Sequence, residues 1–130
     1  MKVFKDESEL IDACLKLFDS IAIHMGRNVY VGGLEIDLIV VVPDILRPSV
    51  HVFEVKRRPK LKLLKQLSTR VLISDYVYVV LPYTAYSWAF TYVPDYVGVV
   101  IVDKFLNPHI IRLPRWLGNG GVLLNLMFKH

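Results

Sequence analysis

Cysteine is nearly absent from this sequence. Cys14 is the only cysteine in 130 residues, so one chain can form neither an internal disulfide nor a cysteine-ligated zinc site. We expect Cys14 to be a small buried apolar group in a protein of a reducing, cytoplasmic compartment. The histidines also lack the spacing of metal ligands. We expect structural or surface positions for all of them: His24, His51, His109 and His130.

Long hydrophobic runs are missing as well. The main apolar runs, Leu38–Val42, Val77–Leu81 and Val97–Val102, are far shorter than the ~20 residues needed to cross a bilayer. Charged residues interrupt the first ten positions, which excludes an apolar signal-peptide core there. We therefore expect no membrane association, and the short apolar runs are typical of buried central strands.

The positive charge of the chain is unevenly distributed. Hydrophobic residues make up 54% of the sequence, which is enough for the core of a single domain over residues 1–130, and the formal net charge is +4. One short stretch holds a cluster of basic residues: Lys56, Arg57, Arg58, Lys60, Lys62, Lys65 and Arg70. A solvated helix face would explain such a cluster, but a phosphate backbone is its simplest partner, and we expect contacts with DNA.

Hydrophobic periodicity predicts a mixed α/β domain. Apolar residues recur at helical spacing over Glu7–Met25, and a second helix with one basic face is predicted over Lys60–Leu72, with Pro59 in its first turn. A short helix is predicted over Ala85–Tyr92. The predicted strands are Asn28–Val31, Glu35–Val42, Val50–Lys56, Asp75–Leu81, Val97–Asp103 and His109–Leu113.

Turn residues separate the predicted strands. Gly32-Gly33 predicts a tight turn or bulge, and Pro43-Asp44 predicts the turn that ends the strand before it. The run Asp75–Leu81 is almost continuously apolar and follows a helix, so we expect an internal strand that is parallel to its neighbour.

An aspartate on one strand and an acid-any-lysine triplet on the next are the main candidates for chemistry. Side chains alternate along a strand, so Glu54 and Lys56 point to one face and Val55 to the other. If the strand bearing Asp37 lies alongside, Asp37 and Glu54 converge as two hard oxygen ligands, which suit Mg²⁺ or Mn²⁺ better than zinc. Lys56 would then lie beside the ion and face the substrate.

This constellation resembles the PD-(D/E)XK superfamily of phosphodiesterases, which includes restriction endonucleases and archaeal Holliday junction resolvases. The resemblance implies a restriction-endonuclease-like αβββαβ core, with a mixed central sheet flanked by helices. It also implies Mg²⁺ (or Mn²⁺) held by Asp37, Glu54 and the main-chain carbonyl of Val55. Ile36 stands where the superfamily name has a proline, which members of the family commonly lack.

Three further polar residues are accessory candidates. Glu7 opens the pattern Glu-Ser-Glu-Leu, which resembles a resolvase motif near the start of the first helix. Glu7 would either reach the water shell of the metal or interact with the helix dipole. Glu35 either contributes to a second metal or, as we favour, lies at the exposed beginning of its strand. Gln66 either reaches the site from the second predicted helix or lies in solvent.

The expected function is hydrolysis of DNA phosphodiester bonds by a metal-dependent endonuclease, selective for branched, Holliday-junction-like DNA. Lys56 would orient or deprotonate the attacking water, or stabilise the developing negative charge. We expect no small-molecule organic cofactor. The alternative is a catalytically inactive nuclease fold that serves as a DNA-binding or protein-interaction module.

The C-terminal stretch predicts a homodimer. Residues Trp116–Phe128 are rich in apolar side chains, and the sequence offers little obvious core for them to join in so small a domain. We therefore expect this stretch to help form a homodimer, which a substrate with two strands or four arms would favour.

Overall fold

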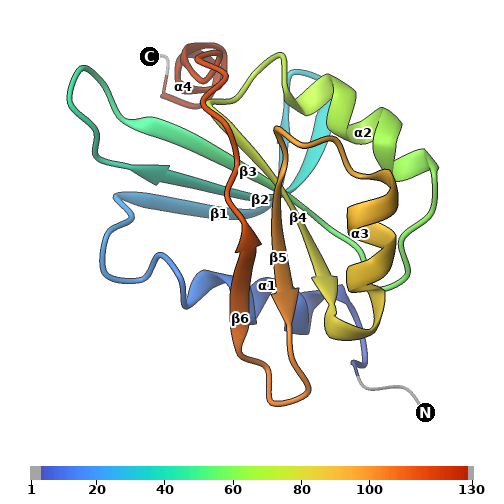
Figure 1. Cartoon of the computed structure of the whole chain (residues 1–130). Helices are drawn as coiled ribbons and strands as arrows, with labels where there is room; N and C mark the ends of the chain where they lie inside the picture. The colour runs from blue at the N-terminus through green and yellow to red at the C-terminus, as the bar shows by residue number, and fades with distance from the viewer. Residues whose placement is uncertain (1–3, 129–130) are drawn as a thin grey trace.

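A six-stranded sheet organises the computed structural model, which describes residues 4–128. The strands lie in chain order across the sheet, from β1 at one edge to β6 at the other (Figure 1). β1, β2 and β3 form an antiparallel meander, β3, β4 and β5 run parallel, and β6 is antiparallel to β5. Their bounds are His24–Val31, Leu34–Val42, Ser49–Val55, Tyr76–Pro82, Gly98–Val102 and Pro108–Arg112.

Helices cover both faces of this sheet. α1 (Glu7–Leu15) packs its apolar side chains on one face, against β3, β4 and β5. α2 (Lys62–Arg70) packs on the opposite face with α3 (Tyr86–Tyr92), which follows the 3₁₀ turn η1 (Tyr83–Ala85). α4 (Gly121–Phe128) covers the meander half of that second face. In Figure 1, α2 and α3 lie together at the right, and α4 lies at the top.

The predicted order of elements is confirmed as far as β6, and the structure adds the helix α4, which was not predicted. The protein is mixed α/β with an open, mixed sheet, and its elements from α1 to β4 follow the order αβββαβ. β4 is internal and parallel to both neighbours, as its apolar sequence predicted. Gly32 and Gly33 form the predicted tight turn between β1 and β2, with positive φ angles of 56° and 79°. Pro43 and Asp44 follow the last residue of β2, as expected of a turn.

The first helix is shorter than predicted. It ends at Leu15 instead of Met25, and β1 begins earlier than expected, at His24. Between them lie tight turns in which the N–H groups of Leu17 and Phe18 donate to carbonyls three residues back. Because these turns keep Phe18 in the core, the apolar spacing continues after the α-helix has ended.

The second helix is also shorter than predicted. It begins at Lys62 instead of Lys60 and ends at Arg70 instead of Leu72. Pro59 therefore precedes the helix and does not occupy its first turn. A tight turn with hydrogen bonds three residues apart precedes the helix and another follows it, so the helical apolar pattern extends past both ends.

The C-terminal segment joins the core, which corrects the expectation that it had none to join. Leu123 of α4 is fully buried against Ile36, Val50 and their neighbours, and Leu124 and Met127 pack beside it. α2 and α3 cover only part of the second face, so the meander strands need this helix to exclude water. The homodimer stays a prediction, but lack of a core for this segment no longer supports it.

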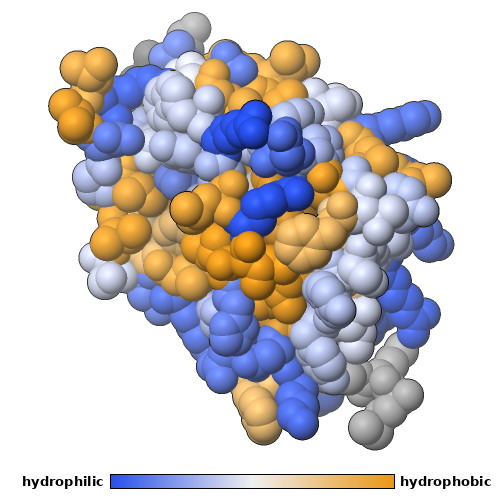
Figure 2. All heavy atoms as spheres, in the orientation of Figure 1, coloured by the Kyte–Doolittle hydropathy of each residue, from blue (hydrophilic) through white to orange (hydrophobic). Residues whose placement is uncertain are grey.

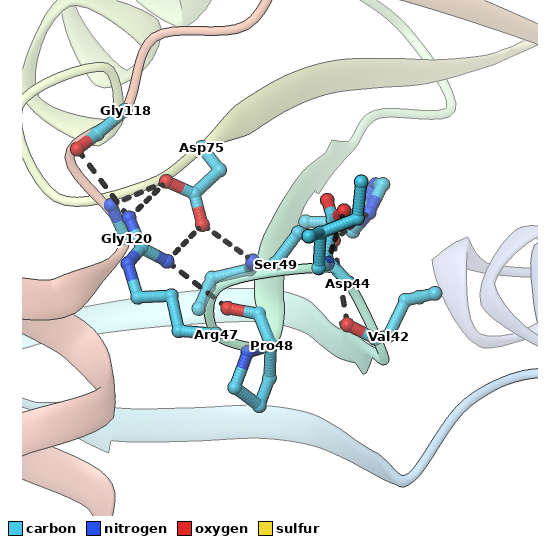
Figure 3. Close-up of polar contacts among 11 residues, drawn as sticks. Val42, Asp44, Arg47, Pro48, Ser49, Asp75, Gly118 and Gly120 are labelled. Carbon is cyan, nitrogen blue, oxygen red and sulfur yellow. Dashed lines mark hydrogen bonds and ion pairs between the residues drawn. The ribbon is translucent and has the colours of Figure 1, made fainter.

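Asp75, just before β4, ties the C-terminal segment to the start of β3 (Figure 3). Its carboxylate accepts hydrogen bonds from two nitrogens of Arg47 at 2.7 and 2.8 Å, and from the N–H groups of Val50 at 2.8 Å and Gly120 at 2.9 Å. Burial alone would raise the pKa of Asp75, but these hydrogen bonds outweigh it and leave the pKa lowered. We call these four residues the Asp75 clasp.

The edge strand β6 leaves apolar side chains uncovered. Ile110 and Ile111 are 38% and 40% exposed, and Leu113 just beyond the strand is 74% exposed. Figure 2 shows hydrophobic atoms gathered in the middle of this view, over the region that β5 and β6 occupy in Figure 1. Apolar side chains at an open sheet edge are typical of a contact surface, so the predicted homodimer has this edge available.

No helix within residues 4–128 combines the length and the apolar character needed to cross a membrane.

Candidate metal and nucleic-acid site

Asp37 and Glu54 lie side by side where β2 and β3 separate. Leu38 and Phe53 are the last directly paired residues of the two strands at this end. Beyond this pair the Asp37 side chain, instead of a main-chain carbonyl of β2, accepts the hydrogen bond from β3. Its Oδ2 accepts from the N–H of Val55 at 2.8 Å. The N–H of Asp37 in turn approaches Glu54 Oε2 at 3.5 Å. The two carboxylates predicted to converge are therefore neighbours.

The environment of Glu54 disfavours its negative charge. The residue is 1% exposed, and burial, followed by the charge of Asp37, raises its pKa to about 7 although Arg70 and Lys56 act in the opposite direction. One of its oxygens, Oε1, is buried and accepts no hydrogen bond from any residue in the range 4–128. A buried carboxylate with a raised pKa and an oxygen that accepts no hydrogen bond is typical of a functional site.

Asp37 shares this environment and is less deeply buried. Burial raises its pKa, and the nearby carboxylates of Glu7 and Glu35 raise it further, against the opposing effects of the Val55 N–H and the Lys56 ammonium. Several acids thus compete for the same poorly solvated space. A divalent cation would relieve that competition by stabilising both ionised forms.

Lys56 and Glu7 complete the group predicted from the sequence. Lys56 immediately follows β3, and its charge lowers the pKa of both Asp37 and Glu54. Glu7 is the first residue of α1, and its Oε2 accepts a hydrogen bond from the N–H of Arg57 at 2.8 Å. The fold therefore brings the start of α1, the end of β3 and the adjacent part of β2 to one corner of the sheet.

The two accessory candidates lie at the margin of this group. The side chain of Glu35 is exposed near the beginning of β2, as we favoured. Its main-chain carbonyl accepts a hydrogen bond from Arg70. Gln66 is half-buried on α2, and its Oε1 is buried with no hydrogen-bond partner among the described residues. Gln66 is therefore not simply a solvent-exposed residue of the basic face.

Arg70 does not belong to the basic surface, which corrects the prediction that it binds nucleic acid. It is 5% exposed, and its guanidinium lies 3.3 Å from Glu54 Oε1, without the alignment of a hydrogen bond. The same group donates to the carbonyl of Glu35 at 2.8 Å. The sequence contains the signal that was missed, because Arg70 falls on the helical stripe of Leu63 and Leu67, which are both buried.

Most of the remaining cations form a surface beside the acidic group. Four of them are exposed: Arg58, Lys60, Lys62 and Lys65. Arg57 is half-buried, and its guanidinium donates to the main-chain carbonyls of Phe4 and Lys5. A hollow of about 160 Å³ is lined by Lys56, Arg58, Lys60, Lys62 and Leu63. A second, of about 350 Å³, is lined by Asp6, Glu7, Arg57, Arg58 and Lys60.

The donor set fits a hard divalent cation in part. Asp37 and Glu54 offer two neighbouring carboxylates, and Oε1 of Glu54 accepts no aligned hydrogen bond, although Arg70 lies 3.3 Å from it. No three side chains of His, Cys, Asp or Glu in the described range come together as a ready metal site. Mg²⁺ is commonly held by one or two carboxylates and keeps several waters, so two carboxylates suffice for it.

The histidines and the cysteine lie outside this group. His51 is buried between the hydroxyls of Ser49 and Tyr78, while His24 and His109 are exposed, in agreement with the structural and surface positions predicted. Cys14 is buried, and burial raises the pKa of its thiol to about 12, as suits an inert core residue. His130 lies outside the described residues.

Comparison of the chain with protein-family models, with curated proteins and with solved structures finds no match. The resemblance to the PD-(D/E)XK superfamily therefore stays a prediction.

Proposed function

We propose that this protein is a metal-dependent endonuclease that hydrolyses DNA phosphodiester bonds. One observation carries the proposal: Asp37 and Glu54 lie side by side in a poorly solvated corner, with Lys56 next to them. A purely structural acid pair would be expected to have its oxygens satisfied by donors, as Asp75 has. Here one buried carboxylate oxygen, Glu54 Oε1, accepts no aligned hydrogen bond and has only the Arg70 guanidinium at 3.3 Å.

A restriction-endonuclease-like core is part of the proposal. It is supported by the order of elements from α1 to β4 and by the separation of β2 from β3 at Asp37. It is also supported by Glu7, because the resemblance implies a glutamate at the start of the first helix, on the side of the metal. These features come from separate segments of the chain, so their meeting at one corner is stronger support than the triplet alone.

Each residue of the corner has a part in the proposed reaction. When bound, Mg²⁺ or Mn²⁺ supplies Lewis-acid polarisation of the phosphate and of a water. Asp37, Glu54 and the carbonyl of Val55 would hold the ion. Lys56, on the same side, stabilises the negative charge that develops on the phosphate oxygens, or it orients or deprotonates the attacking water.

The exposed cations indicate how the DNA is held. Arg58, Lys60 and Lys62 line hollows that begin at Lys56 and Glu7, so phosphates bound there lead directly to the acidic corner. Contacts with phosphates fix the position of a duplex but do not read its sequence. We therefore propose a structure-selective activity on branched, Holliday-junction-like DNA, carried out by a homodimer.

A catalytically inactive DNA-binding or protein-interaction module is the second candidate. It is favoured by the position of Arg70, which already places a positive charge against Glu54. In such a module the basic surface would bind DNA, and the acidic corner would be only a buried polar cluster.

Cleavage assays separate the two candidates. Labelled four-way junction, duplex and single-stranded DNA would be incubated with Mg²⁺, Mn²⁺ or EDTA, using the wild type, Glu54→Gln and Lys56→Ala. We expect metal-dependent cleavage that falls about 100-fold or more in both variants. Asp19→Asn, which removes an exposed carboxylate beyond α1, is the control and should cleave like the wild type. Salt-sensitive binding without cleavage by the wild type would favour the inactive module.

A further inference from the structure

Arg70 is held in place by contacts on several sides. Its Nη2 donates to the Glu35 carbonyl at 2.8 Å, and its Nη1 donates to Thr69 Oγ1 at 2.7 Å. Its charge faces Glu54 Oε1 at 3.3 Å, while the other oxygen of Glu54 lies on the side of Asp37. Arginine cannot lose its proton in a protein, so this positive charge is permanent.

The polar atoms around Arg70 are incompletely satisfied. Three buried side-chain atoms among residues 4–128 have no hydrogen-bond partner: Glu54 Oε1, Gln66 Oε1 and Arg70 Nε. Gln66 and Arg70 are one turn apart on α2, so the three atoms belong to the same region. Such orphan groups need an explanation in a native fold. Here they coincide with the acidic corner.

The charges of the corner limit the number of cations it can take. Four carboxylates, those of Glu7, Glu35, Asp37 and Glu54, are matched by two cations, Lys56 and Arg70, which leaves two negative charges in excess. One divalent ion neutralises that excess. A second divalent ion would add two further positive charges in a poorly solvated space with no acid to offset them.

From this geometry we propose that Arg70 is a positioning residue that orients Glu54 for a single divalent cation and stands in place of a second one. This inference rests on the metal-dependent function proposed above. It assigns Arg70 to the metal site, where the sequence suggested a contact with nucleic acid. Arg70 acts through Glu54 and needs no contact with the substrate.

Counting bound Mn²⁺ tests the inference without DNA and without catalysis. Mn²⁺ would be titrated calorimetrically into the wild type, Arg70→Met, Arg70→Gln and Arg70→Lys, with folding of each variant checked by thermal unfolding. We expect one ion per chain for the wild type and for Arg70→Lys, which keeps the charge. Both neutral variants should bind two. Arg27→Met removes an exposed arginine that pairs with Asp12, and this control should keep one ion.

The outcomes distinguish this inference from the proposed function. A wild type that binds two ions, or neutral variants that bind one ion with unchanged affinity, would overturn the role of Arg70 and leave the nuclease proposal standing. A wild type that binds no Mn²⁺ at millimolar concentration would overturn both. If the neutral variants fail to fold, the counts for the wild type and Arg70→Lys still test whether the site takes a single ion.

Discussion

Two buried acids, Asp75 and Glu54, have opposite surroundings. The carboxylate of Asp75 accepts four hydrogen bonds, two of them from Arg47, and its pKa is lowered. Glu54 has a marginal donor at 3.5 Å, a poorly aligned contact with Arg70 at 3.3 Å and a pKa raised to about 7. Asp75 therefore stabilises the fold in its ionised form, whereas Glu54 is left with electrostatic capacity that a cation can use.

Asp75→Asn should lower the free energy of unfolding by roughly 3 kcal/mol at neutral pH, because it breaks a buried ion pair and removes acceptors. The pKa of Asp75 is lower in the folded state, so its contribution is present above its unfolded pKa and is lost as the pH falls through the folded value. Urea denaturation measures both effects. Asp95→Asn, which breaks the exposed pair with Arg115, should change stability by less than about 0.5 kcal/mol.

At the scale of elements, the C-terminal segment matters because it carries part of the Asp75 clasp. Gly120, just before α4, approaches Asp75 so closely that a Cβ there would lie 2.2 Å from a carboxylate oxygen. Gly121, the next residue, has nothing within 4 Å of the corresponding position. The two neighbouring glycines therefore form a matched pair for mutation.

Gly120→Ala should destabilise the protein by about 2 kcal/mol, because the methyl group must push the Asp75 carboxylate away from its donors. Gly121→Ala should be neutral or stabilising by up to about 1 kcal/mol, because alanine favours the helix and meets open space. Thermal or urea unfolding of the two variants measures the difference. Equal effects at both positions would contradict the close approach.

The basic residues at the start of α2 should make DNA binding depend on salt concentration. The logarithm of the DNA-binding constant falls linearly with the logarithm of the salt concentration. Lys60→Ala together with Lys62→Ala should make this slope less steep by roughly 2, because about 0.9 counterion is released for each phosphate contact. Fluorescence anisotropy of labelled duplex DNA in EDTA measures the slope without cleavage. Lys104→Ala with Arg115→Ala removes the same charge from two other exposed positions and should leave the slope unchanged.

At the scale of the whole molecule, the core on the α1 face contains an uncharged histidine. His51 is stacked on Tyr76 and Tyr78, with its ring nitrogens 3.1 Å from the Ser49 hydroxyl and 2.8 Å from that of Tyr78. Burial lowers its pKa to about 4. Folding therefore keeps His51 neutral at a pH where the unfolded chain would bind a proton.

Stability should fall as the pH drops from about 6.5 toward about 4, because only the unfolded state binds a proton at His51 in this window. The loss attributable to this one group is at most about 3 kcal/mol. Urea denaturation across that pH range measures it. His51→Gln should flatten the dependence, and His24→Gln, at an exposed position, should not. An unchanged profile in His51→Gln would refute this origin of the pH dependence.

Much of the architecture was determined by the sequence itself. Alternation, helical spacing and turn residues are local properties, so they predicted the order of elements, the Gly32-Gly33 turn and the internal position of β4. The same local reasoning placed Glu54 on a strand and Lys56 close behind it, although β3 ends at Val55 and Lys56 follows it. It also overextended both of the first two helices, because tight turns can continue an apolar spacing after the α-helix has ended.

Only the tertiary structure decided how distant residues meet. The helical stripe of Leu63 and Leu67 indicates that Arg70 faces inward, but only the packing of α2 on the sheet placed it against Glu54. The tertiary structure also joined Asp75 to Arg47 and Gly120, which are remote in the chain. These contacts form because whole helices and strands pack together. A local sequence pattern does not indicate which residue, distant in the chain, will become the partner.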